Sequence, residues 1–289
     1  MNITSIHDQA MLAYVSVSCW SARKLDRKAS KQVTKDAKAT DDAARVNKYL
    51  LASADESLKE LQRIGGQVRK FLDSHSLPWD DAGNRLLSNQ TAMSIIGDLY
   101  EYVKQFNAKA DEFADAYPVL RAQALHNLGD MGDDQEYPQP DRIREKFTMR
   151  LSLSPIPTGF SDLRTGLSPD QVQALQAHCV ANITSQVNDA LRSAWERLRG
   201  DVAKVAERMA LSPEGERKIF KNSLIENLRE TCDILDSLNV FDSDEMKVMC
   251  RYVREHIALP PETLRTQVTA AEQVRLNAEA ALKRMQEWM

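Results

Sequence analysis

The stretch that decides the fold runs from Ser168 to Leu211 and reads SPDQVQALQAHCVANITSQVNDALRSAWERLRGDVAKVAERMAL. It opens with a capping box, because Ser168 suits an N-cap, Pro169 suits the first helical position and Gln171 follows the serine by three residues. Beyond this start, an apolar or semi-apolar residue recurs about every 3.7 residues, close to one helical turn. The recurring residues are Val172, Leu175, Cys179, Ile183, Val187, Leu191, Trp195, Leu198, Val202, Val205 and Met209.

A helix of this length would extend roughly 60 Å at about 1.5 Å per residue, and it needs long partners to bury its stripe. Hydrophobic residues make up 43% of the chain and aromatic residues 6%, with ten glycines and ten prolines, which is typical of a mostly helical protein. The fold predicted is therefore mainly α. We expect an elongated bundle of long antiparallel, coiled-coil-like helices with a small two-stranded β element.

Three regions are expected, either separate or joined in one continuous elongated domain: a helical region over 1–167, a long helical hairpin over 168–240 and C-terminal helices over 241–289. Within the first region, alternating apolar residues predict strands near 12–20 and 147–154. A lone strand would leave its backbone groups unpaired, so these two strands are predicted to pair. Two shorter stretches are interpreted as a helix over 41–50 and a loop over 75–90.

The bulk properties exclude several classes of protein. The net charge of −4 gives no global field that favours nucleic acid or membranes. No apolar run approaches the ~20 residues of a membrane span, and the N-terminus lacks the features of a secretory signal, so a cytoplasmic location is expected. The four cysteines are far apart and show no metal-ligand spacing, which favours buried free thiols over disulfides or a metal site.

A basic segment stands out against this composition. Residues 21–40 contain seven lysines and arginines against two aspartates, a net charge of +5. One interpretation is an arm that contacts nucleic-acid phosphates. The other is a solvated helix face or a loop, since no aromatic residue is interleaved with the charges. The candidate nucleic-acid-binding residues are Arg23, Lys24, Arg27, Lys28, Lys31 and Lys35.

The last helix, expected after Pro260-Pro261, is amphipathic and has alanines in its apolar stripe, which suits close packing or self-association. A terminal amphipathic helix can leave an apolar face for a partner. The candidate partner-binding residues are Leu264, Val268, Leu282, Met285 and Trp288.

No catalytic or nucleotide-binding motif is present, and the five histidines are isolated. His75, Asp80 and Asp81 fall in one predicted loop, but their spacing demands no catalytic or metal-binding role. The acidic stretch 129–141 lacks the calcium-loop pattern and is interpreted as a solvated linker. We therefore expect no enzyme activity, no cofactor and no metal.

Several stretches carry a family resemblance, namely residues 7–28, 47–50, 77–80, 117–118, 143–147 and 155–157. They resemble an uncharacterised family found in tailed phages and some bacteria, whose genes often lie beside a MoxR-type AAA+ ATPase and a von Willebrand A-domain protein. The resemblance covers residues 1 to about 210. It implies a non-enzymatic phage interaction or assembly protein in the host cytoplasm, an adaptor of the ATPase system that binds a protein partner or itself. The alternative is a nucleic-acid-binding protein that uses the segment from Arg23 to Lys38.

Overall fold

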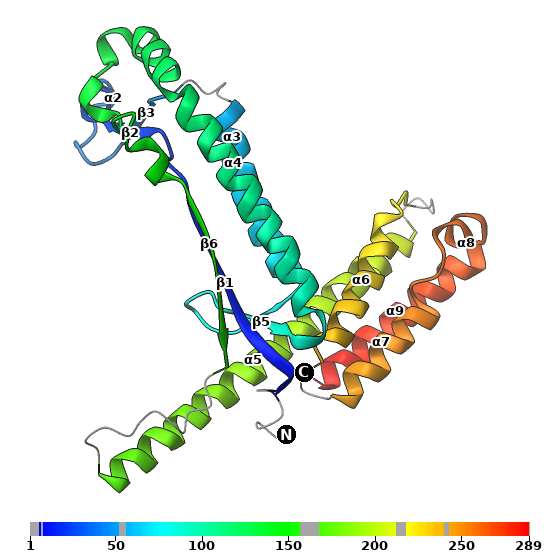
Figure 1. Cartoon of the computed structure of the whole chain (residues 1–289). Helices are drawn as coiled ribbons and strands as arrows, with labels where there is room; N and C mark the ends of the chain where they lie inside the picture. The colour runs from blue at the N-terminus through cyan, green and yellow to red at the C-terminus, as the bar shows by residue number, and fades with distance from the viewer. Residues whose placement is uncertain are drawn as a thin grey trace. The chain divides into compact units, whose positions relative to one another are not determined.

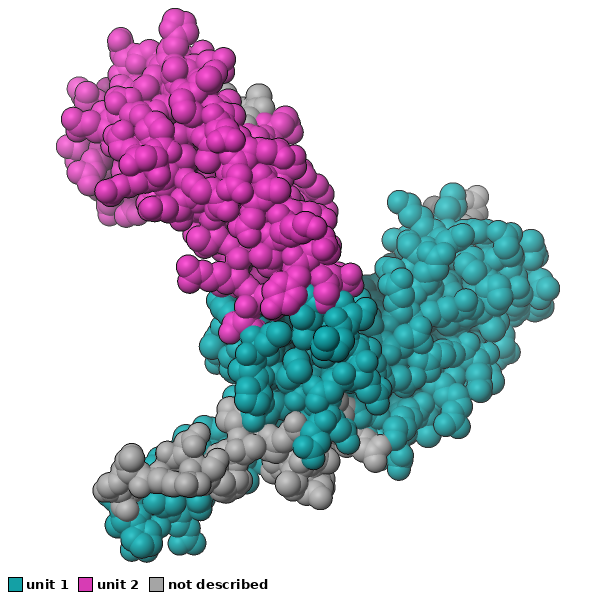
Figure 2. All heavy atoms as spheres, viewed as in Figure 1, with its two compact units in different colours: residues 1–14, 72–96, 153–289 teal, residues 15–71, 97–152 magenta. Residues whose placement is uncertain are grey.

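The structure is a computed structural model that describes residue 6 and residues 8–51, 56–156, 168–211, 218–239 and 243–288 (Figure 1). It is mainly α, as predicted. The chain divides into two compact units, each assembled from separate segments (Figure 2). Unit 1 holds residues 1–14, 72–96 and 153–289, and unit 2 holds residues 15–71 and 97–152. These units cut across the three regions expected from the sequence.

Unit 1 is organised around α5 (Pro169–Met209), the long helix that the sequence predicts. The helix packs against α6 (Ser223–Ser237) and α9 (Val268–Trp288), and α7 (Asp244–His256) packs against both of them. The single last helix expected after Pro260-Pro261 is instead two helices, the short α8 (Pro261–Thr266) and α9, because Gln267 between them is extended. The predicted stripe of α5 is buried or partly buried from Ile183 to Met209, whereas Val172 and Cys179 are half-buried and Leu175 is exposed.

The capping box at the start of α5 is confirmed. The Ser168 side chain accepts a hydrogen bond from the Gln171 backbone N–H, and the Gln171 side chain accepts one from the Ser168 N–H at 2.9 Å. Replacing Ser168 by alanine is expected to weaken the first turn by about 1 kcal/mol. Hydrogen exchange should show amides of this turn exchanging roughly fivefold faster than in Ser168→Asp, which keeps a cap. Equal rates in the two variants would contradict the role of the cap.

A four-stranded sheet has the strand order β4-β5-β1-β6. The predicted strands are β1 (Ala10–Ser18) and β6 (Thr148–Pro155), and their pairing is confirmed. The loop predicted over 75–90 is wrong, because it contains β4 (Leu77–Pro78) and β5 (Arg85–Ser88), which pair antiparallel with each other while β5 pairs with β1. Strands of two and four residues are too short to show a period of two.

Unit 2 contains most of α3 (Glu56–Ser74) and of α4 (Asn89–Leu128), which lie side by side (Figure 1). The Phe71 and Tyr102 rings join them with their centroids 5.6 Å apart. Near the C-terminal end of α4 lies a module made of β2 (Arg23–Asp26), α2 (Arg27–Asp36) and β3 (Val46–Tyr49). The helix predicted over 41–50 is wrong, because β3 occupies its second half and pairs antiparallel with β2.

An aromatic cluster fills the core of unit 2 around Tyr117. Its ring lies 5.8 Å from Trp20 and 5.9 Å from Phe113, and Phe113 in turn lies 5.0 Å from Phe147. The Tyr117 hydroxyl donates a hydrogen bond to the Pro138 carbonyl at 3.0 Å. Burial raises the pKa of Tyr117 to about 12.

This raised pKa predicts a loss of stability in alkali. Below about pH 10, the pKa of an unfolded tyrosine, both states hold the proton and the contribution to stability is complete. As the pH rises toward about 12, the unfolded chain releases the proton first, so the free energy of unfolding falls. Urea unfolding above pH 10 should show that the free energy of unfolding falls less steeply with pH in Tyr117→Phe than in the parent chain. Equal slopes, or a Tyr117 pKa near 10, would contradict this account.

Among the described helices, none has a stretch long and apolar enough to pass through a lipid bilayer.

Candidate nucleic-acid interface

The module of β2, α2 and β3 is fixed by polar contacts at the start of α2. Asp26 is the last residue of β2 and the N-cap of α2, and its side chain accepts a hydrogen bond from the Ala29 N–H at 2.9 Å. The Ser30 hydroxyl donates to the Asp26 carbonyl at 2.6 Å and accepts from the Val46 N–H at 2.9 Å. The buried side of α2, formed by Ser30 and Thr34, is therefore polar and fastened to β3.

Four cations of α2 form what we call the basic stripe. At about 100° per residue, they fall within an arc of about 100° on the helix beside its buried side. All four are exposed, and the structure records no ion pair for any of them within the described residues. The only acid of the helix, Asp36, accepts a hydrogen bond from Gln32 at 2.8 Å. The basic stripe consists of Arg27, Lys28, Lys31 and Lys35.

The paired strands β2 and β3 expose one face. Their register places Arg23 opposite Tyr49 and Leu25 opposite Asn47. Side chains alternate along a strand, so these four share one face of the ribbon, and all four are exposed. We call this surface the open ribbon face. The Arg23 guanidinium lies 4.9 Å from the centroid of the Tyr49 ring. Lys24, the sixth predicted cation, is exposed and points to the other side of the ribbon.

The other face of β3 is anchored through Lys48. Its ammonium lies 2.7 Å from Glu136 Oε2 and donates to the Met131 carbonyl at 2.7 Å, and its side chain is only 9% exposed. A second ion pair joins Arg121 to Asp134 at 2.7 Å. The acidic stretch 129–141, predicted to be a solvated linker, thus contains short 3₁₀ turns and holds β3 in place.

The candidate partner-binding residues of the C-terminus differ in burial. Leu264 and Met285 are 1% and 0% exposed and belong to the core of unit 1, and Leu282 packs against that core. Their burial in the core leaves little of these three side chains for a partner to contact. Val268 and Trp288 remain at the surface, 65% and 39% exposed, although the Trp288 ring lies 5.6 Å from Trp195.

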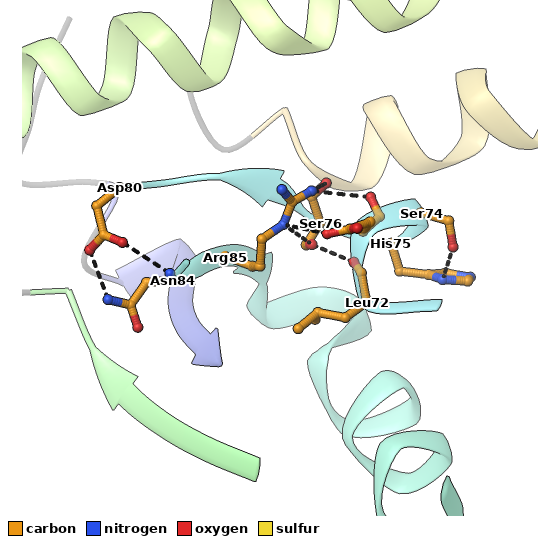
Figure 3. Close-up of polar contacts among 8 residues, drawn as sticks. Leu72, Ser74, His75, Ser76, Asp80, Asn84 and Arg85 are labelled. Carbon is orange, nitrogen blue, oxygen red and sulfur yellow. Dashed lines mark hydrogen bonds and ion pairs between the residues drawn. The ribbon is translucent and has the colours of Figure 1, made fainter. Parts of the chain in front are cut away.

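His75, Asp80 and Asp81 do not form a shared site in the structure. Figure 3 shows Asp80 and His75 at opposite ends of a group of polar contacts. The Asp80 carboxylate accepts hydrogen bonds from Asn84 N–H and Nδ2 at 2.9 and 2.7 Å, while His75 Nδ1 lies 2.9 Å from Ser74 Oγ. Between them, Arg85 donates to Ser76 Oγ at 3.0 Å, and burial lowers the pKa of this arginine.

No cluster of three or more histidine, cysteine or acidic side chains suited to a metal occurs within the described residues. The four cysteines are free thiols, of which Cys232 and Cys250 are buried and Cys19 and Cys179 partly buried. A hydrogen bond with Cys232, and after it burial, raises the pKa of Cys250, which makes this thiol unreactive at neutral pH.

Of the residues singled out from the sequence, the structure brings the six cations together in one module. Sequence reasoning missed Tyr49 and Asn47, because strand pairing alone places them beside Arg23 and Leu25. A strand of four residues is too short to show the period of two that indicates a strand in a sequence, so no local signal predicts this pairing. No family model, curated protein or solved structure matches the chain, so the resemblance to the phage family stays a prediction.

Proposed function

We propose that this chain binds nucleic acid through the basic stripe of α2, together with Arg23 and Lys24 of β2. The observation that carries the proposal is the set of six exposed cations with no ion pair recorded within the described residues. Cations of this kind bind phosphates and release the counterions condensed on the nucleic acid. Since the whole chain has a net charge of −4, the attraction would be local to this module.

The dimensions of the basic stripe suit a phosphate backbone. Arg27 and Lys35 lie eight residues apart, or about 12 Å along the helix axis. Phosphates of one strand of a duplex are spaced about 3.4 Å along its axis, so the stripe can follow roughly four of them. Asp26 caps α2, and Ser30 joins α2 to β3 by a hydrogen bond, so the helix that carries the cations is held in one position in the module.

Fluorescence anisotropy of a labelled oligonucleotide in low salt tests this function. We expect binding by the parent chain and its loss when the basic stripe is replaced by alanine. Binding that survives this replacement, or no binding by the parent chain in low salt, would overturn the proposal.

A second candidate function, the binding of a protein partner, is favoured by a surface of unit 1. A pocket of about 220 Å³ lies there, and Ile219, one of its lining residues, is 94% exposed. Both apolar and cationic side chains line it, which fits a partner segment that carries an apolar residue together with carboxylates. The pocket is lined by Arg208, Met209, Lys218, Ile219, Phe220, Leu264, Arg265 and Ala271.

The AAA+ ATPase implied by the family resemblance is the partner to test, in the setting of a host cytoplasm. Size-exclusion chromatography with light scattering should show co-elution that is lost in Ile219→Glu, because Ile219 lines the pocket. The same run tests self-association through a coiled-coil-like pairing of the first turns of α5, where Val172 and Cys179 are half-buried and Leu175 is 39% exposed. A monomer that ignores the ATPase would contradict both forms of this candidate.

A further inference from the structure

We infer that the open ribbon face binds unpaired bases, so that the ligand of this module is single-stranded nucleic acid and Tyr49 is the residue on which a base stacks. The inference rests on the proposed function and adds to it a ligand class and a base-binding residue. It starts from the composition of the face. Arg23 and Tyr49 form one cross-strand pair, and Leu25 and Asn47 form the next.

These four side chains supply the contacts that a base requires. An aromatic ring offers a stacking surface for any base, because every base has a π-face. An asparagine amide carries both donors and an acceptor and can reach a base edge. Leu25 extends the apolar surface beside the ring and is 39% exposed. Arg23 adds a cation whose guanidinium lies 4.9 Å from the centroid of the Tyr49 ring, and an arginine beside the ring can pair with the phosphate of a nucleotide bound there.

Tyr49 is available because the opposite side of its strand is occupied. Half of the residue's surface is exposed, at 50%. Its neighbour Lys48 is held by Glu136 and Met131, and the backbone N–H of Val46 donates to Ser30. Because alternate residues of β3 are fixed to the protein in this way, the strand cannot rotate to bury the ring.

The ligand is single-stranded for a geometric reason. In a duplex the base faces are stacked on one another, and an aromatic side chain on a protein surface cannot reach them. An unpaired strand exposes those faces and lets its bases turn toward the ribbon while its phosphates follow the helix. The chain provides both parts in succession, since β2 ends at Asp26 and the basic stripe begins at Arg27.

The experiment compares a labelled oligothymidylate with a duplex of the same length, each titrated with the parent chain, Tyr49→Ala and Tyr49→Phe. We expect Tyr49→Ala to bind the single strand roughly tenfold more weakly than the parent chain and the duplex with unchanged affinity. Tyr49→Phe keeps the ring and should bind the single strand as the parent chain does. Circular dichroism of the variants checks that the fold is kept.

The two proposals fail in different ways. If neither oligonucleotide binds in low salt, or if removal of the basic stripe leaves binding intact, the proposed function is wrong. Another outcome is that both oligonucleotides bind through the basic stripe while Tyr49→Ala leaves the affinity for the single strand unchanged, or lowers the affinity for both oligonucleotides equally. In that case the proposed function stands and the inference is overturned. Loss of single-strand binding in Tyr49→Phe as well as Tyr49→Ala would also overturn it, since the ring would not be the cause.

Discussion

Replacing the basic stripe by alanine is expected to weaken binding of a single-stranded oligonucleotide by about 100-fold or more in 0.1 M salt. Each phosphate contact to a single strand contributes about −0.7 to the slope of log K against log salt, so four contacts contribute about −2.8. Over a tenfold range of salt concentration, such a slope corresponds to a several-hundredfold change in affinity. Anisotropy titrations of the parent chain and the variant at several salt concentrations measure both quantities.

The chain offers a control with the same change in net charge. Lys70, Lys104, Arg199 and Lys283 are exposed cations outside the module. Their joint replacement by alanine should leave the affinity and the slope of the parent chain nearly unchanged. If this control loses as much affinity as the stripe variant, the attraction belongs to the charge of the whole chain and not to α2.

Replacing Lys48 by methionine is expected to destabilise unit 2 by about 3 kcal/mol. The substitution leaves the Glu136 carboxylate, whose side chain is 20% exposed, without its cation, and it removes the hydrogen bond to Met131. An unpaired charge in a mostly buried position is among the costliest single changes. Urea unfolding followed by circular dichroism gives the free energy, and faster hydrogen exchange of β3 amides would assign the loss to this module.

An exposed ion pair in the same unit provides the matched control. Lys59 and Glu56 pair at 2.8 Å, but their side chains are 53% and 83% exposed. Lys59→Met should therefore change the free energy of unfolding by no more than about 0.5 kcal/mol. Similar losses in the two variants would show that burial of the Lys48 pair does not stabilise β3.

The helices of this chain are the part of the fold that its sequence predicts best. The Ser168 capping box predicts where the long helix begins, and the regular apolar stripe predicts how far it extends. Both signals are local in the sequence. The ribbon of β2 and β3 has no such signal. Each strand has only four residues, and α2 separates the two strands in the sequence. Residues 41–50 therefore look helical from composition, although Val46–Tyr49 form a strand.

The residues of the candidate site also fall into those that the sequence predicts and those that only the structure identifies. Charge is visible in the sequence, so the six cations could be named beforehand, whereas Tyr49 becomes part of the site only through its register with Arg23. The C-terminal helix shows the opposite problem. An amphipathic stripe has the same pattern whether it faces a core or a partner, and both Leu264 of α8 and Met285 of α9 are buried in the core.

The salt dependence of binding by the unaltered chain tests the central claim most directly. A labelled oligothymidylate titrated between about 50 and 200 mM salt should give a slope of log K against log salt between about −3 and −4, as four to six phosphate contacts at about −0.7 each require. A slope of this size in a chain of net charge −4 can come only from a concentrated basic surface. Absence of binding at the lowest salt, or an affinity that does not change with salt, would contradict the account.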